Sequence, residues 1–172
     1  PVVNFDCKGV DSDYAHIQYL RKVAVDSQRE GQWVFLSMPP QHAKTTSYSV
    51  AFAAWLVLKF RARVVMVCAS RERASEIAVE ASALAEAAGG KFVKRAAFYW
   101  KLSNGGSFKA VGVTAQRVGF SADAVIFDDL FGGYEDYLSK KKRERVWRAV
   151  GGDFLPRLNE SRIKPWVAFV NT

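Results

Sequence analysis

The apolar residues of the chain are arranged in two patterns, short continuous runs that are typical of buried strands and longer stretches with helical spacing. Short apolar runs rich in β-branched residues predict four buried strands, at residues 33–36, 63–69, 124–127 and 164–170. Longer stretches with apolar positions at helical spacing predict helices, at residues 11–29, 45–60, 71–88 and 134–150. Strands and helices that follow one another in this order predict a doubly wound α/β domain with a mainly parallel central sheet flanked by helices.

The middle of the chain departs from this alternation. Residues 97–102 and 107–113 flank Asn104-Gly105-Gly106, and two apolar runs around such a sequence predict a β-hairpin. We therefore expect a β-hairpin insertion in the α/β domain. The helix predicted at 45–60 is apolar nearly all round, which indicates that it is buried.

The bulk properties describe one globular domain of 172 residues, spanning 1–172, with a basic surface. The chain carries 25 Lys and Arg against 17 Asp and Glu, a formal net charge of +8 and a pI near 9.6. This balance favours polyanionic partners, although a basic protein without a nucleic-acid role is the simpler alternative.

Cysteine usage and hydropathy exclude several other classes. Cys7 and Cys68 lie far apart, and Cys68 falls in a predicted buried strand, so we expect a free thiol and no disulfide framework or metal site. The longest apolar run, residues 50–58, is too short to span a bilayer, and no secretory leader is visible. We expect a soluble intracellular domain that is neither secreted nor in a membrane.

The segment 37–46 connects a predicted strand to a predicted helix and is a candidate phosphate-binding loop. Lys44 and Thr45 fill the lysine and hydroxyl positions of the motif G-x-x-x-x-G-K-[ST], whereas Met38 and Ala43 replace its two glycines. The lysine would neutralise the β- and γ-phosphates, the hydroxyl would ligate Mg²⁺, and backbone N–H groups would supply the remaining donors. The alternative is a helix that simply begins after a proline turn.

Two carboxylates follow the buried strand at 124–127. Asp128 would hold Mg²⁺ through water, and Asp129 would orient and deprotonate the water that attacks the γ-phosphate. The second residue has room to turn out of the sheet because the strand ends there. A strand followed by an acidic helix cap is the alternative, but the combination with Lys44-Thr45, each after a predicted strand, favours an ATP site.

These motifs, in this order and spacing, resemble the ATPase domain of phage terminase large subunits. The resemblance extends from about His16 to Thr172 and rests on Pro39-Pro40-x-His42-x-Lys44-Thr45, Ala54-Trp55-Leu56, Gly119 and Ile126-Phe127-Asp128-Asp129. It implies an ASCE-type, RecA-like P-loop NTPase fold. It also implies Mg²⁺-dependent ATP hydrolysis that translocates double-stranded DNA into procapsids, and an RNase H-like nuclease domain after residue 172.

The same resemblance implies the partners of the protein. The family works as a homo-oligomeric ring, pentameric when docked on the procapsid, together with a portal protein and a small terminase subunit. The expected cofactors are ATP and Mg²⁺, and the expected location is the cytoplasm of an infected host cell.

Individual roles are carried over by resemblance to matching positions. Lys44 and Asp129 would be catalytic, and Thr45 and Asp128 would hold the metal. Arg117 matches an arginine that reaches a neighbouring subunit's γ-phosphate, with a solvated loop arginine as the alternative. Asn171 and Thr172 match a motif that couples hydrolysis to movement.

The remaining nucleotide contacts are expected along the loop and on the first helix. Gln41 departs from the family pattern, because the family has an arginine there and a neutral amide removes one positive charge from the phosphate site. Gln18 could read adenine, with a surface glutamine as the alternative. The full expected set is Gln18, Pro40, Gln41, His42, Ala43, Lys44, Thr45 and Thr46.

A basic run on the predicted helix 134–150 is a candidate DNA contact. Val146, Trp147 and Val150 would face inward and the cations outward, although such a run is usually just a solvated face. The candidate residues are Lys140, Lys141, Arg143 and Arg145. Arg71 and Arg73 are further candidates, because cations at a predicted helix N-terminus oppose the helix dipole.

Two other functions fit the same sequence. A helicase-like or other nucleic-acid-dependent P-loop ATPase would share the paired phosphate and acid motifs. A basic DNA-binding module whose degenerate loop no longer binds nucleotide would share the charge but not the chemistry.

Overall fold

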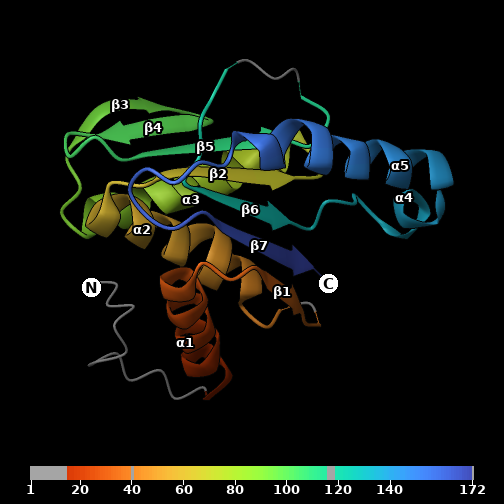
Figure 1. Ribbon diagram of the computed structural model, residues 1–172, viewed down its shortest axis with the longest axis horizontal. Helices are drawn as coiled ribbons and strands as arrows, with labels where there is room; N and C mark the ends of the chain where they lie inside the picture. The colour runs from red at the N-terminus through yellow and green to blue at the C-terminus, as the bar shows by residue number, and fades with distance from the viewer. Residues whose placement is uncertain (1–14, 40, 116–118, 172) are drawn as a thin grey trace.

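The computed structural model describes residues 15–39, 41–115 and 119–171 (Figure 1). Within them, one sheet has the strand order β1-β7-β6-β2-β5-β4-β3. The strands are β1 (Val34–Ser37), β2 (Arg63–Cys68), β3 (Phe92–Ala96), β4 (Tyr99–Leu102), β5 (Ser107–Gly112), β6 (Ala124–Asp128) and β7 (Trp166–Asn171). The helices are α1 (Ala15–Glu30), α2 (Ala53–Phe60), α3 (Arg71–Ala87), α4 (Tyr134–Leu138), α5 (Lys140–Ala149), the π-helices η1 (Thr46–Phe52) and η2 (Val150–Phe154), and the 3₁₀ turn η3 (Leu155–Arg157).

The mainly parallel sheet and the hairpin insertion are confirmed. Strands β1, β7, β6, β2 and β5 run parallel, and β4 pairs antiparallel with β5. The hairpin turn has Gly105 at φ +91°, and the Asn104 side chain accepts a hydrogen bond from the Gly106 N–H at 2.8 Å. Strand β3, which extends this end of the sheet, was not predicted. Four of its five residues are exposed, so it lacks the apolar alternation that identifies a strand.

Side chains on the central strands alternate between two separate cores. On β2, Val64 and Met66 pack with α1, η1, α2 and α3, whereas Val65 and Val67 pack on the other face with α5 and η2. Because both faces are covered, the strand reads as a continuous apolar run rather than an alternating one. Figure 1 shows α1 and α5 on different sides of the sheet.

The predicted helix 45–60 is buried as expected, but its first half differs in geometry. Lys44 and Thr45 are already helical, residues 46–52 form the π-helix η1, and α2 continues to Phe60. π-Helical turns are rare and often occur at functional sites. This one begins directly after the candidate phosphate-binding loop.

The prediction of one helix over 134–150 is wrong. The backbone of Ser139 is extended (φ −72°, ψ 109°), which separates α4 from α5, and its hydroxyl accepts from the Lys142 N–H at 3.4 Å as an N-cap. The expectation that Trp147 faces inward also needs correction. Trp147 is 50% exposed, whereas Val146 and Val150 are buried as predicted.

The N-terminal end of the central strands is held by a partly buried ion pair. Asp123, just before β6, is fully buried and accepts from Arg63 at the start of β2, through the backbone N–H (2.8 Å), Nε (3.0 Å) and Nη2 (2.7 Å). This network fixes two neighbouring strands relative to each other. The sequence analysis did not single out either residue.

The state of Cys68 and the length of the helices can be compared with the expectations from the sequence. Cys68 is a buried free thiol, and burial raises its pKa to about 11. No helix in the described part of the chain is long and apolar enough to cross a membrane.

Candidate nucleotide-binding site

The loop between β1 and the following helix has two residues in the left-handed backbone region, which glycine adopts without strain but other residues do not. Gln41 and Ala43 have positive φ values of 65° and 56°. This left-handed region costs an L-residue roughly 1–2 kcal/mol, and strain of this kind collects at functional sites. The loop thus forms a tight turn without glycine at either position.

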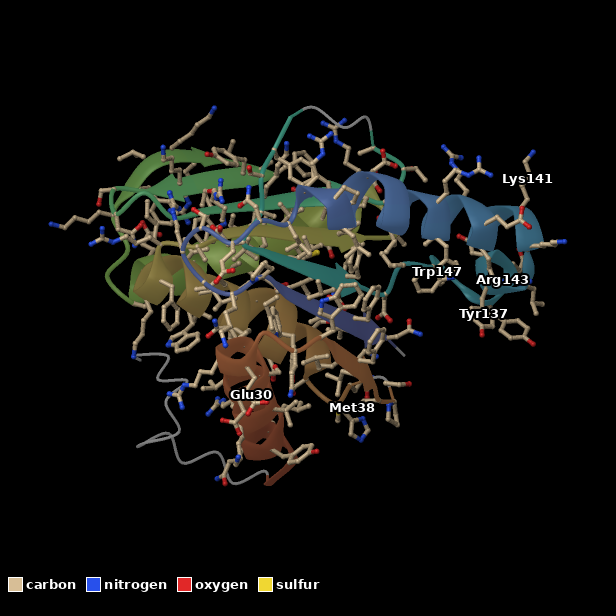
Figure 2. The ribbon with its side chains drawn as sticks, viewed as in Figure 1. Glu30, Met38, Tyr137, Lys141, Arg143 and Trp147 are labelled. Atoms are coloured by element: carbon tan, nitrogen blue, oxygen red, sulfur yellow. The ribbon has the colours of Figure 1, made fainter. Side chains whose placement is uncertain are left out.

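Lys44 stands at the helix start directly after this turn. Its residue is only 5% exposed, and its Nζ donates to the carbonyl of Met38 at 3.2 Å, across the loop. Met38 is labelled in Figure 2, on the side of the sheet where β1 and β7 end. The positive charge of Lys44 is therefore held inside the loop, where an anion bound in the turn would contact it.

The two acids end the central strand β6 in different backbone conformations. Asp128 is the last residue of the strand and is 2% exposed, whereas Asp129 has φ +40° and is partly exposed. The expectation that the second carboxylate turns out of the sheet is therefore confirmed. One acid is directed into the protein beside the helix, and the other borders solvent.

Direct contacts join the loop to the acids across a large sequence separation. The Thr45 hydroxyl donates to Oδ1 of Asp128 at 3.2 Å, and Nζ of Lys44 lies 4.0 Å from Oδ2 of Asp129. These two pairs bring together all four residues that the sequence analysis assigned to phosphate, metal and water.

Asp128 is in an unusual electrostatic state. Burial, and to a smaller degree the nearby charge of Asp129, raises its pKa to about 6, against the opposing effects of Ser49, Thr45 and Arg73. Its Oδ2 is buried and has no hydrogen-bond partner of good geometry among the described residues, and the same holds for Oγ of Ser49. A carboxylate with an unsatisfied buried oxygen is well suited to receive a cation or its bound water.

A cavity of about 270 Å³ opens at this point. Its size suits the phosphate tail of a nucleotide rather than a whole drug-sized ligand. It is lined by Gln41, Ala43, Lys44, Thr45, Thr46, Arg73 and Asp129. Four of the expected loop contacts besides Lys44 therefore border one cavity.

The last strand connects the two halves of the site. Register pairs Ser37 of β1 with Asn171 of β7, and the Met38 N–H donates to the Asn171 carbonyl at 3.2 Å. One residue earlier, the Val170 carbonyl accepts from the Asp129 N–H at 2.9 Å. The end of β7 thus holds the first residue of the loop and the second acid through adjacent carbonyls.

Several predicted site residues lie elsewhere or cannot be placed. Gln18 on α1 and His42 in the loop are exposed and do not line the cavity in the described part of the chain. Pro40, Arg117 and Thr172 lie outside the described residues.

The residues present fit a magnesium ion that also uses ligands from a nucleotide. Among the described residues, no group of three or more His, Cys, Asp or Glu could hold a metal by itself. Thr45 and Asp128 supply two oxygens, and Mg²⁺ typically completes its octahedron with waters and phosphate oxygens. The donor set is therefore appropriate for Mg·nucleotide rather than for the bare ion.

Two residues at the site were missed or assigned differently. Ser49 lies one helical turn after Thr45, so helical spacing from the hydroxyl position could have found it. Arg73 was singled out only as a candidate DNA contact, yet it lines the phosphate-sized cavity. Its position became visible only when the topology placed the start of α3 beside the end of β6.

Comparison with known proteins gives a structural match alone. The large terminase of bacteriophage HK97 superimposes with a TM-score of 0.60 at 16% sequence identity, over 90% of this chain. The α/β fold of this chain is therefore similar to that of part of this terminase. The chain covers 32% of that protein's length, so it corresponds to about a third of it. No family model matches the sequence, and no curated protein matches it significantly.

Proposed function

We propose that this domain binds and hydrolyses Mg·ATP and uses the energy to translocate double-stranded viral DNA, as the motor domain of a terminase large subunit. The observation that carries the proposal is the contact between Thr45 and Asp128 at 3.2 Å, with Lys44 and Asp129 beside it. The terminase-like fold supports the biological setting.

The chemistry assigned to each residue follows from its position. The Lys44 ammonium exchanges its contact with the Met38 carbonyl for the β- and γ-phosphate oxygens. Thr45 and Asp128 would hold Mg²⁺, which would neutralise charge on the phosphates. Asp129, turned toward solvent, orients the attacking water and accepts its proton.

Hydrolysis is coupled to movement through β7 in this proposal. The Val170 carbonyl accepts from the N–H of the second acid, and the Asn171 carbonyl accepts from the N–H of the first loop residue. A movement of the loop or of the acid would therefore displace the end of β7. In the sheet, β7 lies between the loop strand β1 and the acid strand β6, so it contacts both halves of the site.

DNA contact is assigned to the outer face of α5. Lys141 and Arg143 lie toward the far end of this helix (Figure 2). Arg143 also has a structural role, because its guanidinium donates to the Leu138 carbonyl at 2.8 Å at the end of α4. Arg145 lines a separate cavity with Arg148 and Arg157, so we extend the expected phosphate contacts to these two arginines.

The test is steady-state ATP hydrolysis by Lys44→Ala and Asp129→Ala. Each variant is expected to lose at least about a hundredfold in turnover, because charge stabilisation or water activation is removed. Circular dichroism checks that the fold persists. Lys59→Ala is the matched control, since Lys59 lies over the Trp55 ring on α2, away from the cavity, and should retain turnover. Undiminished hydrolysis by either site variant would refute the proposed function.

A further inference from the structure

Arg73 is brought to the phosphate cavity by the start of α3. Strand β2 ends at Cys68, which pairs in register with Asp128 of β6, so α3 begins next to the acid. The helix N-terminus is fixed by the Ser70 hydroxyl, which accepts from the Arg73 N–H at 3.2 Å. The Arg73 side chain, 48% exposed, then lines the cavity together with Gln41 and Lys44.

The Arg73 guanidinium lies where a positive charge is unfavourable unless an anion compensates it. A cation in the first turn of a helix opposes the positive end of the helix dipole. In the described structure its Nη1 is held by Glu76 at 2.9 Å. Glu76 first, and Asp128 in addition, raise the pKa of Arg73, so the guanidinium interacts with both carboxylates.

Its neighbour Arg71 has a different environment. The Arg71 guanidinium lies over the Phe98 ring, 4.8 Å from its centroid, and does not line the cavity. Two arginines in the same helical turn thus separate into one packed on an aromatic ring and one exposed to the cavity.

We propose that Arg73 binds the terminal phosphate of ATP within the same subunit. This inference rests on the proposed function. Lys44 and Arg73 line the same cavity from different elements, so α3 adds a second cation to the one that follows the loop. A planar guanidinium matches two phosphate oxygens at once. Because ADP lacks the γ-phosphate, this contact favours ATP over ADP.

Calorimetric titrations of wild type, Arg73→Ala and Arg71→Ala with Mg·ADP and with a non-hydrolysable Mg·ATP analogue test this assignment. Arg73→Ala should bind the ATP analogue about tenfold more weakly, with ADP affinity changed less than about threefold. Arg71→Ala should keep both affinities. Equal binding of the analogue by Arg73→Ala and wild type would overturn the inference and leave the proposed function intact.

Two further variants separate phosphate binding from a structural role of the Arg73–Glu76 pair. Glu76→Gln removes the same ion pair but keeps the guanidinium, so it should bind the analogue at least as tightly as wild type. If Glu76→Gln instead weakened binding as much as Arg73→Ala, the role would be structural and the inference wrong. Gln41→Arg in the Arg73→Ala background should restore preference for the ATP analogue, which helix stabilisation alone would not do. Wild type that binds neither nucleotide would refute the proposed function and this inference together.

Discussion

Two buried aspartates at opposite ends of one strand have opposite environments. Asp123, just before β6, is fully buried and receives three hydrogen bonds from Arg63. Asp128, at the other end, is almost as buried, but one carboxylate oxygen has no hydrogen-bond partner of good geometry among the described residues. Its pKa is raised to about 6, mainly by burial.

These environments indicate that Asp123 stabilises the fold, whereas Asp128 is available to interact with a ligand. A buried carboxylate is stable only when its charge is compensated, and Arg63 does this for Asp123 within the protein. At Asp128 the effects of Ser49, of the Thr45 hydroxyl and of the charge of Arg73 compensate only in part. The remaining compensation is expected from Mg²⁺ and its waters.

The largest effect on stability is expected for Asp123→Ala. Removing the carboxylate leaves the backbone N–H and Nε of Arg63 without their acceptor, at a cost of about 3 kcal/mol in the free energy of unfolding. Urea denaturation measures this loss. Asp26→Ala, which breaks an exposed pair with Lys22, is the control and should cost less than about 0.5 kcal/mol. A similar small loss in Asp123→Ala would show that the two acids do not differ as described.

Asp128→Asn should have the opposite effect on stability. The neutral amide removes the cost of a buried charge, so the ligand-free variant is expected to be more stable than wild type by about 2 kcal/mol at pH 7. ATP hydrolysis should nevertheless fall at least about a hundredfold, because the carboxylate that would hold Mg²⁺ through water is lost. A variant that was both less stable and fully active would contradict the functional assignment of Asp128.

The pH dependence of stability should show the same contrast. The pKa of Asp128 is raised from 3.8 when unfolded to about 6 when folded, so the folded state binds the extra proton between these values. The stability that protonated Asp128 contributes is therefore fully present below about pH 4 and is lost as the pH rises through about 6, where the buried carboxyl ionises. Denaturation of ligand-free wild type and Asp128→Asn across this range measures the difference between the two proteins. A difference that stayed constant with pH would argue against the raised pKa.

A smaller effect is expected at the strained loop. Ala43→Gly places glycine at φ +56°, where it is unstrained, and offsets part of that gain through greater freedom when unfolded. The net change should be a stabilisation of up to about 1 kcal/mol with ATP binding retained. Thermal denaturation with and without Mg·ATP measures both. Destabilisation by glycine would mean that the alanine methyl group packs favourably in the loop.

Most of the fold could be predicted because its signals are local. Buried strands such as residues 124–127 are apolar on both faces, and the hairpin turn at 104–106 contains the residues that such turns require. Strand β3 was missed because its side chains are mostly exposed and it is recruited by pairing with β4. The break at Ser139 could have been found from its capping hydroxyl, but the helical pattern around it was read as continuous.

The candidate site divides in the same way. Lys44, Thr45, Asp128 and Asp129 could be proposed as site residues because each follows a predicted strand, and strand ends converge at one edge of a parallel sheet. Arg73 could not be assigned to the phosphate cavity, since its place depends on β2 lying beside β6. The Asp123–Arg63 pair had no signal either, because its two members are 60 residues apart and match no motif.

We propose that the loop before Lys44 and the acids at the end of β6 form one Mg·ATP site. Calorimetric titration of the wild-type protein with ATP, in Mg²⁺ and again in EDTA, measures whether they do. We expect one bound nucleotide per chain, with tighter binding in Mg²⁺ than in EDTA. Absence of ATP binding under both conditions, or binding that Mg²⁺ does not strengthen, would show that no such site is formed.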